Sequence, residues 1–138
     1  MRLTGNDPAS SLLPAVFNWI RADPERPVLG TCAGAILLAE PEDGGDPLVD
    51  AKIERNGFGS QADSFQCSVE ATILGREFLG VFIRAPRFTS SGVNAKVTAK
   101  LDDEVVGLVT HNRMALSFHP ELSGDSGFHE WLLRAAEK

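Results

Sequence analysis

A cysteine between two glycines is the most chemically suggestive feature of the sequence. The segment Gly30-Thr31-Cys32-Ala33-Gly34 separates a short apolar run from an Ala- and Leu-rich stretch, which predicts a sharp strand-to-helix turn. In such a turn the glycines relieve clashes between strand and helix, and the helix dipole favours a thiolate at Cys32. The backbone N–H of Ala33 would be placed to donate to an oxyanion. The motif alone fits a buried structural cysteine equally well, because free cysteines are often buried.

A second segment, Ser117-Phe118-His119-Pro120-Glu121-Leu122, follows a predicted strand and could supply the base that a thiol nucleophile needs. His119 would stand at the strand end, and Glu121 could accept the other ring N–H and fix the tautomer. The alternative is a surface histidine in a proline turn, which for this segment alone is the more common case. The occurrence of both segments in one chain favours a catalytic set of Cys32, His119 and Glu121.

Composition narrows the possible partners and the compartment. The chain has 138 residues, 43% hydrophobic and 23% charged, which suits one domain over 1–138. Its net charge is −6 and its basic residues are scattered, which argues against a nucleic-acid partner. No apolar run could span a bilayer and no signal peptide is recognisable, so we expect a cytoplasmic protein in which Cys32 and Cys67 are thiols. Two Cys and three His without ligand spacing predict neither a metal nor another cofactor.

Apolar periodicity predicts the elements that hold these residues. Spacing of three and four predicts helices over 10–21, 33–40 and 127–138. A short apolar strand over 27–31 leads to the cysteine, and a run over 80–83 reads as a central strand. Alternation predicts further strands over 49–54, 65–69, 93–101, 105–110 and 114–118, with a loop over 41–47 and turns at 57–59, 102–103 and 111–112. This order of elements is typical of an α/β domain with an added antiparallel portion.

Four segments in one order give the chain a family resemblance. They are residues 30–39, Ile53-Glu54-Arg55-Asn56-Gly57-Phe58-Gly59-Ser60-Gln61-Ala62-Asp63-Ser64-Phe65, Val81-Phe82-Ile83-Arg84-Ala85-Pro86, and 117–122. From about Pro27 onward the sequence closely resembles the glutaminase subunit of pyridoxal 5′-phosphate synthase. The first and last segments are shared by all class I glutamine amidotransferases, whereas the two middle segments are far more specific to this subunit.

The resemblance implies a class I glutamine amidotransferase fold, a flavodoxin-like three-layer α/β sandwich. It implies that the domain hydrolyses L-glutamine to glutamate and ammonia. The ammonia would pass through a tunnel to a separate (β/α)8-barrel synthase subunit that makes pyridoxal 5′-phosphate, a form of vitamin B6. By match of motif, Cys32 is the nucleophile, His119 the base and Glu121 its orienting partner.

The same resemblance places Arg55, Ile83 and Arg84 at positions associated with glutamine binding. Arginine suits the α-carboxylate of the substrate, and backbone groups at a strand end can fix its amino-acid end. For Arg84, a salt bridge at the strand end is a nearly equal alternative.

The sequence departs from the family pattern in two places. Ser60 stands where the family has arginine in Phe-Gly-Arg-Gln, which would weaken a partner or loop contact. Family members begin with a strand, a helix, a second strand and a Pro-Gly-Gly-Glu-Ser-type turn, which normally supplies an oxyanion N–H. No such segment precedes Ser10.

The second departure leads us to expect an N-terminally truncated domain. Loss of one oxyanion donor costs about 10²–10³ in rate, so we expect a weak or inactive glutaminase that is prone to associate. The alternative function is a catalytically impaired subunit that only binds or regulates the synthase. Ammonia supply to a different acceptor enzyme is a third, and the two subunit-specific segments argue against it.

Overall fold

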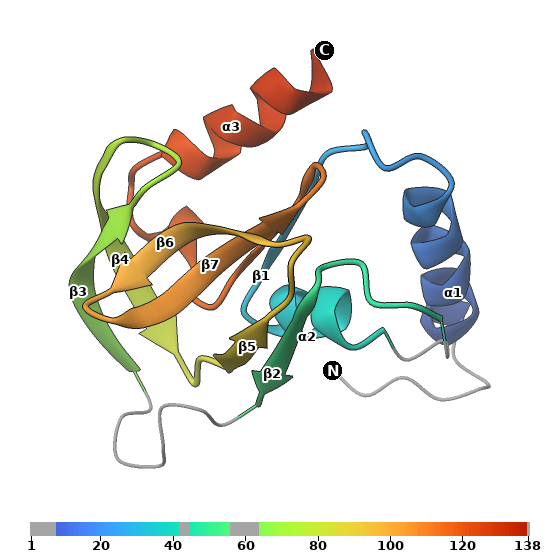
Figure 1. The fold of residues 1–138 in the computed structure, drawn as a ribbon, viewed down its shortest axis with the longest axis horizontal. Coiled ribbons are helices and arrows are strands. Elements are labelled where there is room, and N and C mark those ends of the chain that lie inside the picture. The colour runs from blue at the N-terminus through green and yellow to red at the C-terminus, as the bar shows by residue number, and fades with distance from the viewer. Residues whose placement is uncertain (1–7, 42–44, 56–63, 138) are drawn as a thin grey trace.

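The computed structural model describes residues 8–41, 45–55 and 64–137, with side chains in the first helix from Pro14 onward. None of the helices in these ranges is long and apolar enough to cross a membrane. The elements, in chain order (Figure 1), are α1 (Pro8–Arg21), β1 (Val28–Thr31), α2 (Ala33–Ala39), β2 (Ala51–Glu54), β3 (Ser64–Ala71), β4 (Arg76–Ile83), β5 (Arg87–Ser91), β6 (Lys96–Leu101), β7 (Glu104–Thr110), β8 (Arg113–Leu116), a short 3-10 turn η1 (Pro120–Leu122) and α3 (Gly127–Ala136).

The strands form a main sheet and a small accessory one. Within the described residues the main sheet has the order β1-β8-β7-β6-β3-β4, and β2 pairs with β5 in a separate antiparallel ribbon. Among these strands only β1 and β8 run parallel, with Thr31 opposite Leu116. The carboxyl ends of β1 and β8 therefore meet at one edge of the sheet, where ligands bind in open α/β folds.

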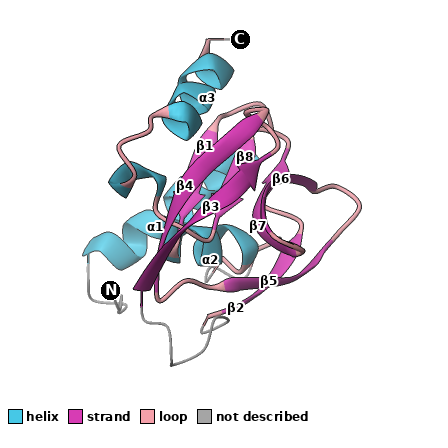
Figure 2. Ribbon diagram, turned by 90° about the vertical axis from the view of Figure 1, so that its left-hand side faces the viewer, coloured by secondary structure: helices cyan, strands magenta, loops and turns pink. Residues whose placement is uncertain are grey.

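Helices cover both faces of the main sheet (Figures 1 and 2). On β7 and β8, alternate side chains enter different cores, with Leu108 and Ala115 on one face and Val109 and Met114 on the other. The first core is filled from α1, α2, β2 and β5 by Phe17, Ile20, Ala35, Ile36, Leu38, Ala39, Ile53 and Phe88. The second core includes Phe128 of α3. This is the predicted three-layer α/β fold, with an antiparallel part larger than the parallel one.

The main sheet curls until its far edge approaches the end of β8. After β8, the N–H of Ser117 donates to the carbonyl of Val106 on β7 at 2.9 Å. Two residues later, the N–H of His119 donates to the carbonyl of Val81 on β4 at 2.8 Å. The chain leaving β8 thus crosses from β7 to β4, and this crossing brings both edges of the sheet together.

The curl explains why the prediction of a central strand over 80–83 was wrong. Among the described strands, β4 pairs only with β3 and lies at the edge of the sheet. Gly80, Val81 and Phe82 are nevertheless all buried, because the segment after β8 covers the outer side of the strand. A continuous apolar run indicates a strand that is buried on both faces. Here the curl of the sheet buries β4, although the strand has no second neighbouring strand among the described residues.

The alternation over 93–101 also predicted too long and too regular a strand. β6 begins at Lys96, and Val93 lies before it in a turn, 99% exposed. Register shifts between Val97 and Ala99 break the two-residue period, so that Thr98 and Ala99 are both buried. Such bulges cannot be read from apolar alternation alone.

Strand β5 was missed because Phe88 is the only apolar residue among its five. The other predicted helices and strands are present with ends shifted by a few residues. The turn predicted at 57–59 lies outside the described residues.

Candidate active site

Cys32 occupies the turn between β1 and α2 in a conformation that non-glycine residues rarely adopt. Its φ of 52° and ψ of −108° lie outside the helical and extended regions. Its N–H donates to the carbonyl of Leu116 at 2.8 Å, and its own carbonyl accepts from the N–H of Ala35 at 3.0 Å. Backbone hydrogen bonds on both sides therefore hold the cysteine in the strained turn that the motif predicted.

The two flanking glycines have different roles, which the sequence did not separate. A Cβ at Gly30 would lie 2.7 Å from the carbonyl oxygen of Gly34 and 2.6 Å from the Cδ1 of Leu38. A Cβ at Gly34 would meet no atom within 4 Å. Close approach of strand and helix thus requires glycine at position 30, and the expectation of a clash at position 34 was wrong.

This difference predicts opposite effects on stability for a matched pair of substitutions. Gly30→Ala forces a backbone contact apart and should lower the free energy of unfolding by about 2–3 kcal/mol. Gly34→Ala has open space and a helical position, so it should be neutral or stabilising by up to about 1 kcal/mol. Thermal unfolding of both variants measures this, and equal losses would contradict the assignment.

The thiol of Cys32 points towards the end of β4. Its Sγ donates to the carbonyl of Ile83 at 3.5 Å, across 51 residues of sequence. Burial raises the pKa of the Cys32 thiol, the N–H of Ala33 lowers it, and the carboxylate of Glu121 raises it further. The net direction is upward, opposite to the thiolate expected from the helix dipole. A raised pKa favours the thiol form of Cys32, so a nucleophilic role would require a base that takes its proton.

The raised pKa predicts the pH dependence of Cys32 alkylation. A higher pKa lowers the thiolate fraction at neutral pH, so reaction with iodoacetamide should be slow there. The rate should still be rising with pH above about 8.5, where an ordinary thiol is half ionised. In the Cys67→Ser variant Cys32 is the one remaining thiol of the sequence, so mass spectrometry of the alkylated protein over time gives the rate at Cys32 alone. A rate that is already maximal near neutral pH would show a thiolate and contradict the prediction.

His119 and Glu121 form a close side-chain pair. The Nδ1 of His119 lies 2.6 Å from Oε2 of Glu121. With Nδ1–H donating to the carboxylate, Nε2 keeps its lone pair and can accept a proton. The sequence predicted this pairing from the two-residue spacing alone.

Packing around Phe118 fixes the backbone that carries His119. Phe118 is fully buried, with its ring centroid 5.4 Å from that of Phe82 and 5.7 Å from that of Phe128. The rings of β4 and α3 thus hold the residue immediately before the histidine. The carbonyls of Val81 and Leu116, which bind the backbone of His119 and Cys32, were not foreseen, because sequence patterns carry no signal for such contacts.

The three predicted substrate-binding residues lie at the ends of two strands. Ile83 ends β4 with its carbonyl beside Cys32, and Arg84 follows with a left-handed φ of 45° and an exposed side chain. Arg55 is an exposed turn residue just after β2. Glu54, the residue before Arg55, is paired with Arg87 where β2 meets β5. Arg55 therefore lies near the short segment that joins Arg84 to β5. The structure therefore brings Ile83 to the cysteine and leaves both arginine side chains exposed.

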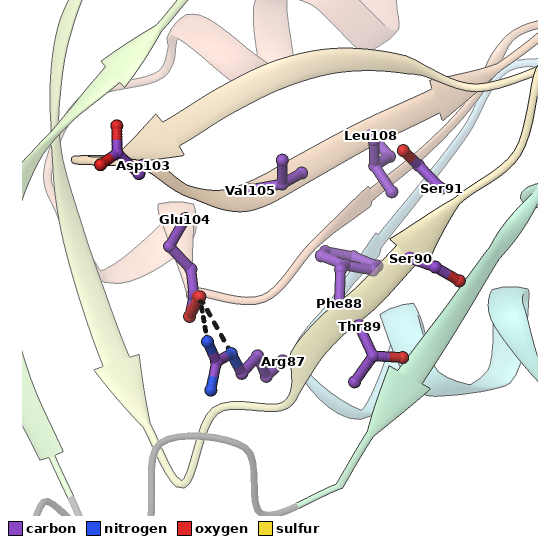
Figure 3. Close-up of a pocket in the computed structure, with 9 residues that line it drawn as sticks. All are labelled: Arg87, Phe88, Thr89, Ser90, Ser91, Asp103, Glu104, Val105 and Leu108. Atoms are coloured by element: carbon purple, nitrogen blue, oxygen red, sulfur yellow. Dashed lines mark hydrogen bonds and ion pairs between the residues drawn. The ribbon is translucent and has the colours of Figure 1, made fainter.

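A pocket of about 370 Å³ lies between β5 and β7 (Figure 3). An ion pair between Arg87 and Glu104, at 2.8 Å, stands at one end, and Phe88, Val105 and Leu108 also line it. No predicted site residue is among the described residues that line this pocket. The candidate active site is thus identified by its side-chain chemistry and by converging strand ends.

Comparisons with known proteins agree with this fold. A solved structure described as a glutamine amidotransferase matches with a TM-score of 0.72 and 42% identity, covering 80% of this chain and 60% of that one. A glutamine amidotransferase from Thermotoga maritima has a TM-score of 0.59 at 17% identity, covers 99% of this chain and 60% of that one, and supports the fold alone. The fold is that of the glutamine amidotransferases.

The family follows from the sequence comparisons. Residues 9–138 match the model of the SNO glutamine amidotransferase family, and the chain belongs to that family. It is 44% identical over 113 residues to pyridoxal 5′-phosphate synthase subunit PdxT of Methanothermobacter thermautotrophicus, covering 80% of this chain and 58% of the relative. The PdxT of Pyrococcus horikoshii is 44% identical over 115 residues, covering 78% and 59%. The chain spans under two thirds of the length of these relatives.

Proposed function

We propose that this chain hydrolyses L-glutamine to L-glutamate and ammonia and supplies the ammonia to a pyridoxal 5′-phosphate synthase subunit. The observation that carries the proposal is the placement of Cys32. Its thiol stands on a strained strand-to-helix turn, 3.5 Å from the Ile83 carbonyl, on the strand that also binds the His119 backbone. The identity to two PdxT proteins supports the choice of pathway.

In the proposed reaction, Sγ of Cys32 attacks the side-chain amide carbon of glutamine. His119 takes the thiol proton at Nε2 and gives it to the departing nitrogen, which leaves as ammonia. Water then attacks the resulting thioester, His119 takes a proton from that water, and the proton returns to the sulfur as glutamate leaves. Glu121 holds the Nδ1–H throughout and stabilises the imidazolium that forms in each step.

The thiol must turn from its resting partner for this chemistry to begin. In the structure its hydrogen bond goes to the Ile83 carbonyl. Catalytic contacts are often loose without substrate and tighten when it binds. The N–H of Ala33, which lowers the pKa of the Cys32 thiol, would donate to the oxyanion of the tetrahedral intermediate.

Substrate recognition is proposed for the strand ends beside the thiol. Arg55 and Arg84, both exposed residues, would contribute guanidinium groups to bind the glutamine α-carboxylate, and the backbone at Ile83 would fix the α-amino group. The partner would be the (β/α)8-barrel synthase subunit that receives ammonia.

The experiment is an ammonia-release assay on the 138-residue chain, with and without a purified barrel subunit of pyridoxal 5′-phosphate synthase. We expect slow glutamine-dependent release of equal amounts of glutamate and ammonia from the chain alone, increased by the barrel subunit. Binding to the barrel subunit without release in either setting would contradict the proposal and favour a purely regulatory subunit. Release from asparagine as fast as from glutamine would contradict the substrate assignment.

A further inference from the structure

We propose that Ser123 is a positioning residue that holds Glu121 on the catalytic histidine, an inference that rests on the proposed function. Ser123 ends η1, the short turn that carries Glu121. Its hydroxyl donates to the carbonyl of Pro120 at 2.8 Å and accepts from the N–H of Asp125 at 3.1 Å. One half-buried hydroxyl therefore links the start of η1 to Asp125, two residues before α3.

The Pro120 carbonyl matters because it belongs to the peptide unit that ends in the nitrogen of Glu121. That carbonyl accepts from the Ser123 hydroxyl and also from the Ser123 N–H at 3.2 Å. Two donors on one oxygen fix the plane of the peptide and so the direction in which the Glu121 side chain leaves the backbone. The Glu121 side chain is 44% exposed, so side-chain packing alone does not fix its position.

The far end of the link is anchored to the sheet. The carboxylate of Asp125 accepts from the N–H of Gly127 at 2.9 Å and pairs with Arg76 at the start of β4, with contacts of 2.6 and 2.9 Å. A Cβ at Gly127 would lie 2.7 Å from Nη2 of Arg76, so the helix start and the strand are closely apposed. Ser123 thereby ties Glu121 to β4, the same strand whose Val81 carbonyl binds the backbone of His119.

His119 and Glu121 are thus both anchored to β4, each by a separate set of hydrogen bonds. The histidine reaches β4 directly through its N–H, and the glutamate reaches it through Ser123, Asp125 and Arg76. Loss of the Ser123 hydroxyl would leave the histidine in place but remove one of the two donors that orient the peptide before Glu121, so the carboxylate would be held less firmly on the ring. The expected defect is therefore in the rate of the chemical step, with little effect on substrate binding.

The test compares three variants of the full chain. Ser123→Ala should lower kcat for glutamine roughly tenfold with KM within about twofold, since it disturbs orientation alone. Ser123→Thr keeps the hydroxyl and should restore most of kcat. Ser126→Ala is the matched control: its hydroxyl, in the same loop, donates to Glu130 at 3.3 Å, away from the Pro120 carbonyl, and kcat should not change.

A spectroscopic measurement separates this inference from the proposed function. A short Nδ1–H···carboxylate hydrogen bond gives a low-field imidazole proton resonance, identified by its loss in Glu121→Gln. We expect the resonance in the wild type, Ser123→Thr and Ser126→Ala, and its loss or broadening in Ser123→Ala, whether or not glutamine is hydrolysed. An unchanged resonance in a folded Ser123→Ala protein would overturn the inference. If that variant does not fold, the resonance in Ser123→Val, which lacks a side-chain donor and matches the shape of the Ser123→Thr control, decides in the same way.

Discussion

Replacement of Cys32 by alanine should abolish glutamine hydrolysis, lowering kcat by at least roughly 10⁴-fold. The expectation is this large because every covalent step of the proposed reaction passes through the sulfur. Without the sulfur, the other proposed catalytic groups, His119 and Glu121, could only orient a water molecule to attack glutamine directly. Ammonia release, measured with the barrel subunit present, gives the rate.

The control for this variant is the second thiol. Cys67 lies on β3 and is free, like Cys32, so Cys67→Ser tests whether the loss is specific to one cysteine. We expect Cys67→Ser to keep the wild-type rate. A Cys32→Ala protein that still binds the barrel subunit shows that its fold survives. Residual activity above about one hundredth of wild type would exclude Cys32 as the nucleophile.

The second large effect is expected at His119. His119→Ala removes the group that accepts the thiol proton, and the raised pKa of Cys32 makes that loss severe, because little thiolate is present at neutral pH. We expect kcat to fall by roughly 10³–10⁴-fold, with KM nearly unchanged. The proposed substrate contacts lie at Arg55, Ile83 and Arg84, which the substitution leaves in place.

Two comparisons sharpen this prediction. Glu121→Gln keeps the shape of the side chain but removes the charge that stabilises the imidazolium, so its loss should be smaller, roughly 10²-fold. Raising the pH supplies thiolate directly and should recover part of the activity of His119→Ala, though not of Cys32→Ala. An activity of His119→Ala that does not rise with pH would contradict the assignment of His119 as the base for Cys32.

The local parts of the site could be predicted from the sequence because their geometry is encoded over a few residues. The strained turn at Cys32 follows from a Gly-x-Cys-x-Gly segment between an apolar strand and a helix. The 2.6 Å contact of His119 with Glu121 follows from a two-residue spacing at a strand end. Each of these requires only the neighbours along the chain.

The long-range parts could not be predicted because they depend on how the sheet bends. Ile83 meets Cys32 across 51 residues only because the sheet curls from β1 round to β4. The bulges near Ala99 that break the alternation of β6, and the burial of Phe82 at a sheet edge, likewise depend on contacts between segments far apart in the sequence. Apolar patterns report which side chains are buried, but not which distant strand covers them.

The role of Cys32 is tested most directly by labelling with a diazoketone analogue of L-glutamine, followed by peptide mapping with mass spectrometry. Such an analogue alkylates the nucleophile that attacks the substrate carbon. The expected result is a single modification on the peptide that contains Cys32, suppressed by excess L-glutamine and absent from Cys67. Labelling of Cys67 instead, or labelling of Cys32 that glutamine does not suppress, would contradict its assignment as the glutaminase nucleophile.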